Sequence, residues 1–325
     1  MQNFALVLAS IALTAVSWGV YGPLIRWGGQ GMQGSHLLPF ICVGFAYFLI
    51  AVLVPGLLMA MRGEQGKWTV TGTIWSFVAG IMGAVGALGV ILALNTGGNS
   101  AAIFVMPLVF GGAPVVNTFT TMSMSRSFRD AGPLFYAGLI LVITGAAVVL
   151  VFNPAAKALE NALDFSTLTK VLMYVAMTAL CWGVYGPVLH KGQMLMQGSR
   201  LRPFMCVGLA YFLVAVIVPL LLRTALGDHG ELTAEGISWS LAGGTAGALG
   251  ALGIILAFTF GGKPVYVMPL VFGGAPVINT LLTIATSKNI GEINPFFYAG
   301  LIVVVAGAAT VLVFSPKPHG KPPAK

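Results

Sequence analysis

The sequence predicts an all-α membrane protein whose ten transmembrane helices form two five-helix repeats, inserted in opposite orientations with both termini in the cytoplasm. Three observations lead to this fold class. Of the 325 residues, 58% are hydrophobic and only 7% are charged, whereas soluble domains carry about 25% charged residues. Apolar runs of about 20 residues, the length of a transmembrane helix, recur along the chain. Long sequence blocks also occur twice.

The apolar runs define the predicted spans, and the short connections between them hold nearly all of the charge. The first run lacks a basic flank, and its counterpart in the second half is internal, so we expect a retained helix rather than a signal peptide. The predicted spans are roughly 4–26, 37–61, 71–95, 101–124, 132–152, 167–190, 200–224, 237–260, 263–285 and 294–314.

The internal duplication covers most of the chain. Trp18–Pro55 aligns with Trp182–Pro219 at a constant offset, with 25 identities in 38 positions. Residues 105–118 (VMPLVFGGAPVVNT) recur at 267–280 with a single change, Val116 to Ile278. The predicted organisation is a first repeat at 1–152, a linker at 153–166, a second repeat at 167–315 and a basic cytoplasmic tail at 316–325.

Five spans is an odd number, so the second repeat enters the membrane with the opposite orientation. The side that holds both termini carries more lysine and arginine, which the positive-inside rule assigns to the cytoplasm. Matched positions differ in the same sense, as where Lys191 replaces Trp27. The richer side holds Arg62, Lys67, Arg126, Arg129, Lys191, Arg200, Arg202, Lys263, Lys317, Lys321 and Lys325; the other holds Arg26, Lys157, Lys170, Arg223 and Lys288.

A Gly-Gly-Ala-Pro motif interrupts the fourth and ninth spans at matched positions. Proline lacks an N–H and glycine lowers the cost of unwinding, so local breaks are expected there. Paired interrupted helices in an inverted repeat point to the central site of a transporter; simple kinking is the alternative. The predicted hinge residues are Gly111, Gly112, Pro114, Gly273, Gly274 and Pro276, with Pro23 and Pro187 in the first and sixth spans.

Polar and aromatic side chains near these motifs are the candidate substrate-binding residues. Amides and hydroxyls offer donors and acceptors to a ligand, although they also bind neighbouring helices together. The tryptophan and tyrosine of each WGVYGP element are expected to form gates at opposite mouths of the transporter, or stacking walls for a ring-shaped substrate. The alternative is an aromatic belt at the membrane interface, where tryptophan and tyrosine are enriched. The candidates are Trp18, Tyr21, Asn117, Thr118, Trp182, Tyr185, Asn279 and Thr280, with Tyr47 and Tyr211 as weaker ones.

Two further repeated features have structural interpretations. Ser35 and Ser199 precede spans 2 and 7 and are expected to cap these helices, with a proline in the first turn of each. Glycines recur along one face of spans 3 and 8, at Gly83, Gly86 and Gly89 and at Gly247, Gly250 and Gly253. These glycines are expected to allow close helix packing rather than to bind a nucleotide.

Several functional classes lack support in the sequence. No acidic residue lies inside a predicted span, which argues against a carboxylate proton relay there and leaves a histidine or a loop carboxylate as the alternative for proton coupling. Facilitated diffusion, exchange and sodium coupling are the other options. No P-loop or HExxH motif occurs, and Cys42, Cys181 and Cys206 fit no zinc or disulfide pattern. We therefore expect no enzyme, cofactor, metal or nucleic-acid partner. A channel, a receptor and an intramembrane enzyme remain less favoured alternatives.

Ten helices in two inverted five-helix copies resemble the drug/metabolite transporter (EamA-like) superfamily over nearly the whole chain. WGVYGP at Trp18–Pro23, followed by a glycine-containing turn, is most similar to the glucose/ribose-porter and ureide-permease branches. The resemblance implies that spans 1–4 and 6–9 surround a central cavity, that spans 5 and 10 lie outside it and mediate a homodimer, and that the aromatic and asparagine candidates lie near the cavity. Some such sugar porters are proton-coupled, a pattern from which the acid-free spans depart.

Together these observations predict a secondary transporter for a small polar or amphipathic metabolite, working by alternating access in the lipid bilayer. An exporter of drugs or other amphipathic compounds with the same fold is the alternative. The short loops suggest a bacterial inner membrane. Substrate, direction and coupling ion are left open by the sequence.

Overall fold

The computed structural model describes residues 2–33, 35–101, 105–126, 130–152, 164–225, 227–286 and 294–314. Within these ranges every regular element is a helix. The elements are α1 (Gln2–Gly31), α2 (Leu37–Phe48), η1 (Leu49–Leu53), α3 (Val54–Arg62), α4 (Val70–Ala101), α5 (Val105–Ser125), α6 (Pro133–Val151), α7 (Phe165–Leu195), α8 (Leu201–Tyr211), η3 (Phe212–Ile217), α9 (Val218–Leu222), α10 (Ala234–Thr259), α11 (Pro264–Thr286) and α12 (Pro295–Phe314).

Seven helices in the described part of the chain are long and apolar enough to cross a membrane. They are Asn3–Gly31, Leu37–Met61, Val70–Gly98, Phe165–Leu195, Leu201–Leu222, Ala234–Thr259 and Pro264–Leu282. Two shorter apolar helices cover Pro133–Val149 and Pro295–Val311. The all-helical prediction is confirmed, and the helices are compatible with a polytopic membrane protein.

Two of the apolar helices contain a π-helical turn that the sequence analysis did not predict. Segment η1 lies between α2 and α3, and η3 lies between α8 and α9 at the equivalent place in the second copy. In each, a backbone N–H reaches five residues back, from Val54 to Leu49 and from Val218 to Leu213. The next residue is Pro55 or Pro219. Proline cannot donate to the carbonyl four residues back, and the wider turn accommodates that loss.

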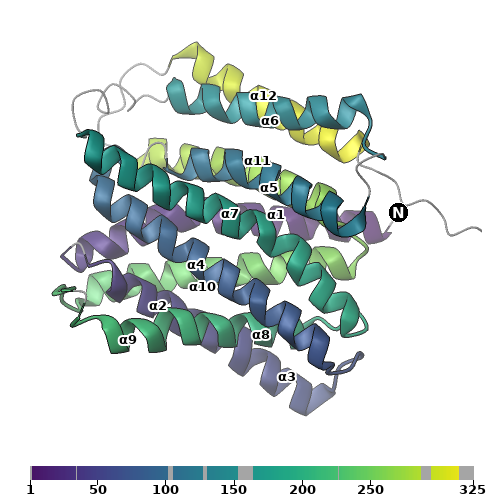
Figure 1. Ribbon diagram of the computed structural model, residues 1–325, viewed down its shortest axis with the longest axis horizontal. Coiled ribbons are helices and arrows are strands. Elements are labelled where there is room, and N and C mark those ends of the chain that lie inside the picture. The colour runs from purple at the N-terminus through teal and green to yellow at the C-terminus, as the bar shows by residue number, and fades with distance from the viewer. Residues whose placement is uncertain are drawn as a thin grey trace, which may run out of the picture.

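The helices stack in layers, and each layer holds one helix from each of the two sequence copies (Figure 1). From one side to the other the layers are α6 with α12, α5 with α11, α1 with α7, α4 with α10, and α2 with α8. The principal contacts are between copies: α4 packs on α7, α10 on α1, and α6 on α12. Glycines permit this approach, since a Cβ on Gly138 or Gly300 would crowd the backbone of Val311 or Val149.

The predicted breaks at the Gly-Gly-Ala-Pro motifs are absent from the structure. Helices α5 and α11 remain helical through Pro114 and Pro276. A proline removes one intrahelical hydrogen bond, and neighbouring helices can support the rest of the turn. The expectation of local breaks at these positions is therefore wrong, while the hinge role stays a prediction.

The predicted linker is mostly outside the described residues, as is the basic tail at 316–325. Only the last part of the linker is described. There Asp164 caps α7 by accepting hydrogen bonds from the N–H groups of Ser166 and Thr167. Helix α7 thus begins at Phe165, slightly before the predicted start of the second repeat.

Candidate functional site

A small aromatic cavity lies at the centre of the helix layers. Its lining comes from both copies: Trp18, Tyr21, Tyr47 and Gly83 from the first, and Trp182, Tyr185, Tyr211 and Gly247 from the second. Each residue of the first set has its repeat equivalent in the second. The free space at the centre is about 20 Å³, which is room for about one water molecule.

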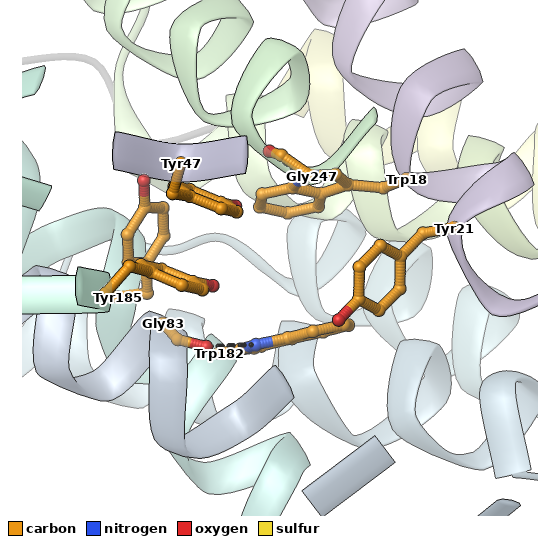
Figure 2. Close-up of a pocket in the computed structure, with 8 residues that line it drawn as sticks. Trp18, Tyr21, Tyr47, Gly83, Trp182, Tyr185 and Gly247 are labelled. Carbon is orange, nitrogen blue, oxygen red and sulfur yellow. Dashed lines mark hydrogen bonds between the residues drawn. The ribbon is translucent and has the colours of Figure 1, made fainter. Parts of the chain in front are cut away.

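Two tryptophans face each other across this cavity (Figure 2). The ring centroids of Trp18 and Trp182 are 5.8 Å apart and the rings are inclined by 22°. Figure 2 shows Tyr21 at one side of the pair and Tyr47 and Tyr185 at the other. The ring of Tyr21 meets Trp182 edge-on, with centroids 6.1 Å apart, and Tyr185 meets Trp18 at 6.2 Å. The cavity thus has two roughly parallel indole walls and two tyrosine walls inclined to them.

The tryptophans are fixed by the glycine faces of α4 and α10. The Nε1 of Trp18 donates to the Gly247 carbonyl at 3.3 Å, and that of Trp182 donates to the Gly83 carbonyl at 3.2 Å. A Cβ on Gly250 or Gly86 would overlap the same indoles. The predicted close packing at these glycines is confirmed, and it also holds in place the two indoles that form the cavity walls.

Phenylalanines of the Gly-Gly-Ala-Pro motifs reach the same tryptophans. Phe110 lies 6.3 Å from Trp182 and Phe272 lies 6.0 Å from Trp18, measured between ring centroids. The two phenylalanines are 6.1 Å apart, and both are fully buried. Each directly precedes the glycine pair of its motif. Any bend of α5 or α11 at these glycines would therefore move a ring that contacts the cavity wall.

The four tyrosine hydroxyls fall into two groups. Tyr47 and Tyr211 stack with centroids 3.6 Å apart and a 2° inclination, and their hydroxyls are not among the buried groups that lack a partner. The hydroxyls of Tyr21 and Tyr185 are buried and have no hydrogen-bond partner among the described residues. Buried polar groups normally find a partner, and these two hydroxyls lie in the cavity lining, where a ligand could supply one.

The structure brings together four of the eight predicted binding residues. Trp18, Tyr21, Trp182 and Tyr185 all line the cavity. Of the two alternatives for the Trp-Tyr pairs, gates at opposite mouths are contradicted, since Trp18 and Trp182 stack on each other; stacking walls for a ring stay a prediction. Sequence position within a helix could not reveal this, because contact across the copies depends on how the helices cross.

The predicted polar candidates are buried but lie outside the cavity lining. They are Asn117, Thr118, Asn279 and Thr280, each 4% exposed or less. Asn117 donates from Nδ2 to the Pro264 carbonyl at the start of α11, at 3.1 Å. This bond fits the alternative role, a polar connection between helices.

The proline hinges of α1 and α7 also lie in continuous helices. Pro23 is inside α1 and Pro187 inside α7. The preceding glycines allow close contacts, since a Cβ on Gly22 would crowd Asn279 and Met106, and one on Gly186 would crowd Met268.

Two carboxylates that the sequence analysis did not single out each accept several hydrogen bonds from the other sequence copy. Glu64 accepts hydrogen bonds from Ser199 Oγ, Arg200 N, Leu201 N and Arg202 at 2.6, 2.6, 2.8 and 3.0 Å. We call Glu64, Ser199 and Arg202 the Glu64 cluster. The carboxylate comes from the α3–α4 connection of the first copy and caps helix α8 of the second.

The repeat-equivalent carboxylate, Asp228, caps helix α2 from the second copy. It accepts from Ser35 Oγ, His36 N and Leu37 N at 2.6, 2.9 and 2.9 Å. Arg223 Nε lies 3.5 Å from its Oδ1. We call Asp228, Ser35 and Arg223 the Asp228 cluster. The α3–α4 and α9–α10 connections that carry the two carboxylates lie at opposite ends of the molecule (Figure 1).

The predicted serine caps are confirmed as part of these clusters. Ser35 Oγ accepts from Leu38 N at 3.0 Å, and Ser199 Oγ accepts from Arg202 N at 3.3 Å. Burial alone would raise the pKa of Asp228, but the hydrogen bonds from Ser35, Leu37 and His36 and the charge of Arg223 outweigh burial. The pKa of Asp228 therefore lies below its usual value.

Comparisons with known proteins define the fold and no more. No protein-family model and no curated protein matches the chain. A solved structure described only as "Crystal structure of protein" is similar over 97% of this chain and 98% of its own, with a TM-score of 0.62 and 17% identity. Across the described ranges no group of three or more potential metal ligands occurs. The fold and site thus define a helical bundle, compatible with a membrane protein, around a central aromatic cavity.

Proposed function

We propose that this chain is a secondary transporter that moves a small polar or amphipathic metabolite by alternating access. The observation that carries the proposal is the central cavity, which the two sequence copies line with equivalent residues. A carrier needs one site that is reachable in turn from either side of the membrane. Equivalent walls from two copies provide a site that presents similar surroundings in both directions.

The proposed membrane topology has ten spans in two inverted repeats with cytoplasmic termini, as in the drug/metabolite transporter superfamily. In this scheme α2, η1 and α3 are one span, and α8, η3 and α9 are its equivalent. The excess of basic residues on the side of the termini supports the orientation. The mutual packing of α6 and α12 beside the cavity-forming helices agrees with outer spans. A bacterial inner membrane and a homodimer are part of the same proposal.

The two carboxylate clusters are the proposed closures at either end. Each joins a loop of one copy to a helix start of the other, so separation of the copies at that end breaks the cluster. Bending at the Gly-Gly-Ala-Pro motifs would couple this movement to Phe110 and Phe272, which contact the tryptophans. Opening of one cluster while the other holds would give access from one side at a time.

Export of amphipathic cations is the second candidate function. The lining of two tryptophans and four tyrosines favours it, because aromatic faces attract a cation by about 0.5–2 kcal/mol each. The substrates of the two candidates differ in charge, so one assay can separate them.

The test is transport into proteoliposomes made with the full-length protein. Uptake would be measured for sugars, nucleosides, ureides, amino acids and tetraphenylphosphonium, each with and without a sodium gradient. A carrier gives saturable uptake that Trp18→Ala with Trp182→Ala abolishes. The double variant Tyr136→Ala with Tyr298→Ala, at exposed repeat-equivalent positions outside the cavity lining, should retain uptake. Saturable uptake confined to tetraphenylphosphonium would select the export function. Unitary conductance in planar bilayers without saturable uptake would identify a channel and refute the proposal.

A further inference from the structure

We propose that the central cavity binds an uncharged, planar heterocyclic ring between Trp18 and Trp182, with hydrogen-bonding groups on two opposite ring edges that meet Tyr21 and Tyr185. This inference rests on the proposed function and specifies its substrate class. Three properties of the cavity carry it: the spacing of the indoles, the unpartnered hydroxyls and the repetition of the lining in both copies.

The indole spacing suits a flat ring. Stacked aromatic groups approach to about 3.5 Å, so a ring held between two indoles needs them about 7 Å apart. The observed centroid separation is 5.8 Å and the planes are inclined by 22°. Because this separation is an upper limit on the gap between the rings, the indoles must move apart by at least about 1 Å to admit a planar ring with both faces covered. A puckered sugar ring with substituents on both faces is thicker and needs a larger displacement of α1 from α7.

The hydroxyls favour an occupant with hydrogen-bonding groups over a purely apolar one or a tetraalkylammonium ion. Tyr21 and Tyr185 are each 3% exposed, line the cavity and lack a hydrogen-bond partner within the described structure. A tetraalkylammonium ion satisfies the aromatic faces but leaves both hydroxyls unpaired. A ring carbonyl or ring N–H can accept from or donate to a hydroxyl. The lining also holds no carboxylate, so a desolvated cation would lack a counter-charge there.

The repetition of the lining predicts the shape of the ligand. Tyr21 lies against Trp182 and Tyr185 against Trp18, in equivalent contacts from the two copies. The hydroxyls of the stacked Tyr47 and Tyr211 pair are not among the buried groups that lack a partner. The two available hydroxyls thus come from opposite copies, and a ligand with hydrogen-bonding groups on opposite edges reaches both. Such a ring can bind in either of two orientations related by exchange of the copies.

The test is direct binding to the purified full-length protein, measured by isothermal titration calorimetry and by quenching of tryptophan fluorescence. The probes are three neutral planar heterocycles (uracil, hypoxanthine and lumazine), with glucose as the puckered ring and tetraethylammonium as the cation. At least one heterocycle is expected to bind, and neither glucose nor tetraethylammonium should. The variant Tyr21→Phe with Tyr185→Phe should weaken that binding at least ten-fold.

A matched control removes hydroxyls elsewhere. Tyr136 and Tyr298 are repeat equivalents on α6 and α12, exposed and outside the cavity, and their double replacement by phenylalanine should leave affinity unchanged. Binding of glucose or tetraethylammonium in place of every heterocycle, or of none of the five probes, overturns the ring assignment. Equal loss in both double variants overturns the role of Tyr21 and Tyr185. A heterocycle that binds but is not taken up by proteoliposomes supports the ligand class and refutes transport instead.

Discussion

Replacing Glu64 by glutamine removes the charge from one end of the molecule while its repeat equivalent, Asp228, stays intact. Glu64 is 6% exposed and its ion-pair partner Arg202 is 12% exposed, so solvent screens the pair weakly. Glutamine preserves the shape and can still accept from the N–H groups of Arg200 and Leu201. It loses the charge assistance of those bonds and leaves Arg202 without its counter-charge.

The magnitude follows from the contacts. A hydrogen bond to a charged group contributes about 1.5–3 kcal/mol, against about 1 kcal/mol for a neutral one. With two N–H bonds weakened and one ion pair lost, we expect closure at this end to weaken by about 2 kcal/mol. That energy corresponds to an increase of about 30-fold in the population open at the Glu64 end. Asp228→Asn should give only about 1 kcal/mol and about five-fold at the other end, because Arg223 is more distant and more exposed.

Cysteine labelling measures the two ends separately. Met196 and Met32 are repeat equivalents, both 0% exposed. The Met196 carbonyl accepts a hydrogen bond from the backbone N–H of Lys67, beside the Glu64 cluster. The Met32 carbonyl accepts one from the backbone N–H of Ser35, in the Asp228 cluster. In a background with Cys42, Cys181 and Cys206 replaced by alanine, Glu64→Gln should accelerate maleimide labelling of Met196→Cys and leave Met32→Cys unchanged or slower.

The reciprocal variant and a control complete this experiment. Asp228→Asn should accelerate Met32→Cys alone, and Glu235→Gln, an exposed acid at the start of α10, should change neither rate. Equal acceleration at both cysteines would mean that Glu64 stabilises the whole fold rather than one closure. Unchanged labelling at both would mean that the Glu64 cluster does not limit opening.

Three further predictions use the cavity and the Asp228 cluster. Tyr21→Phe with Tyr185→Phe should raise the melting temperature of the ligand-free protein, because each substitution removes a buried hydroxyl without a partner in the described structure, worth about 1 kcal/mol; a lower melting temperature would contradict this account. Gly250→Ala should lower the free energy of unfolding by about 1–3 kcal/mol, because the new Cβ overlaps Trp18, whereas Gly132→Ala, with open space around it, should not. Equal melting temperatures of the two variants would be inconsistent with tight packing of Trp18 on Gly250. The pKa of Asp228 is lowered from 3.8, so its carboxylate stabilises the folded protein above about pH 4, and this stabilisation is lost as the pH falls through the lowered pKa. The difference in melting temperature between the natural protein and Asp228→Asn should therefore shrink in that acidic range and stay constant above it.

The positions of the helices and the serine caps of two of them could be predicted from the sequence because they depend on local patterns. Apolar runs of membrane-spanning length gave the positions of the helices, and serines before a proline-containing first turn gave the caps of α2 and α8. The duplicated WGVYGP element identified four residues that line the cavity. The π-helical turns were missed because the apolar pattern alone does not distinguish an α-helical from a π-helical turn.

The carboxylate clusters were not predictable because they depend on the assembled copies. Glu64 lies 135 residues before Ser199, and Asp228 lies 193 residues after Ser35. Each acid appears in the sequence as an ordinary charged residue in a loop, for which solvent exposure is the usual expectation. Only the packing of α3 beside α8 and of α2 beside η3 and α9 brings these residues together.

The pattern of identities between the copies does contain information about the site, once contact between the copies is considered. Trp18 and Trp182, Tyr47 and Tyr211, and Phe110 and Phe272 each contact their own repeat equivalent. A residue in such a contact has the same surroundings in both copies, so the same side chain suits both positions. Towards the ends of α1 and α7 the surroundings differ, and so do the residues: Trp27 packs on Trp239, whereas its equivalent Lys191 lies over Trp75. Identical aromatic residues in a duplicated membrane protein are therefore candidates for the place where the copies meet, and differing residues for the ends that face different compartments.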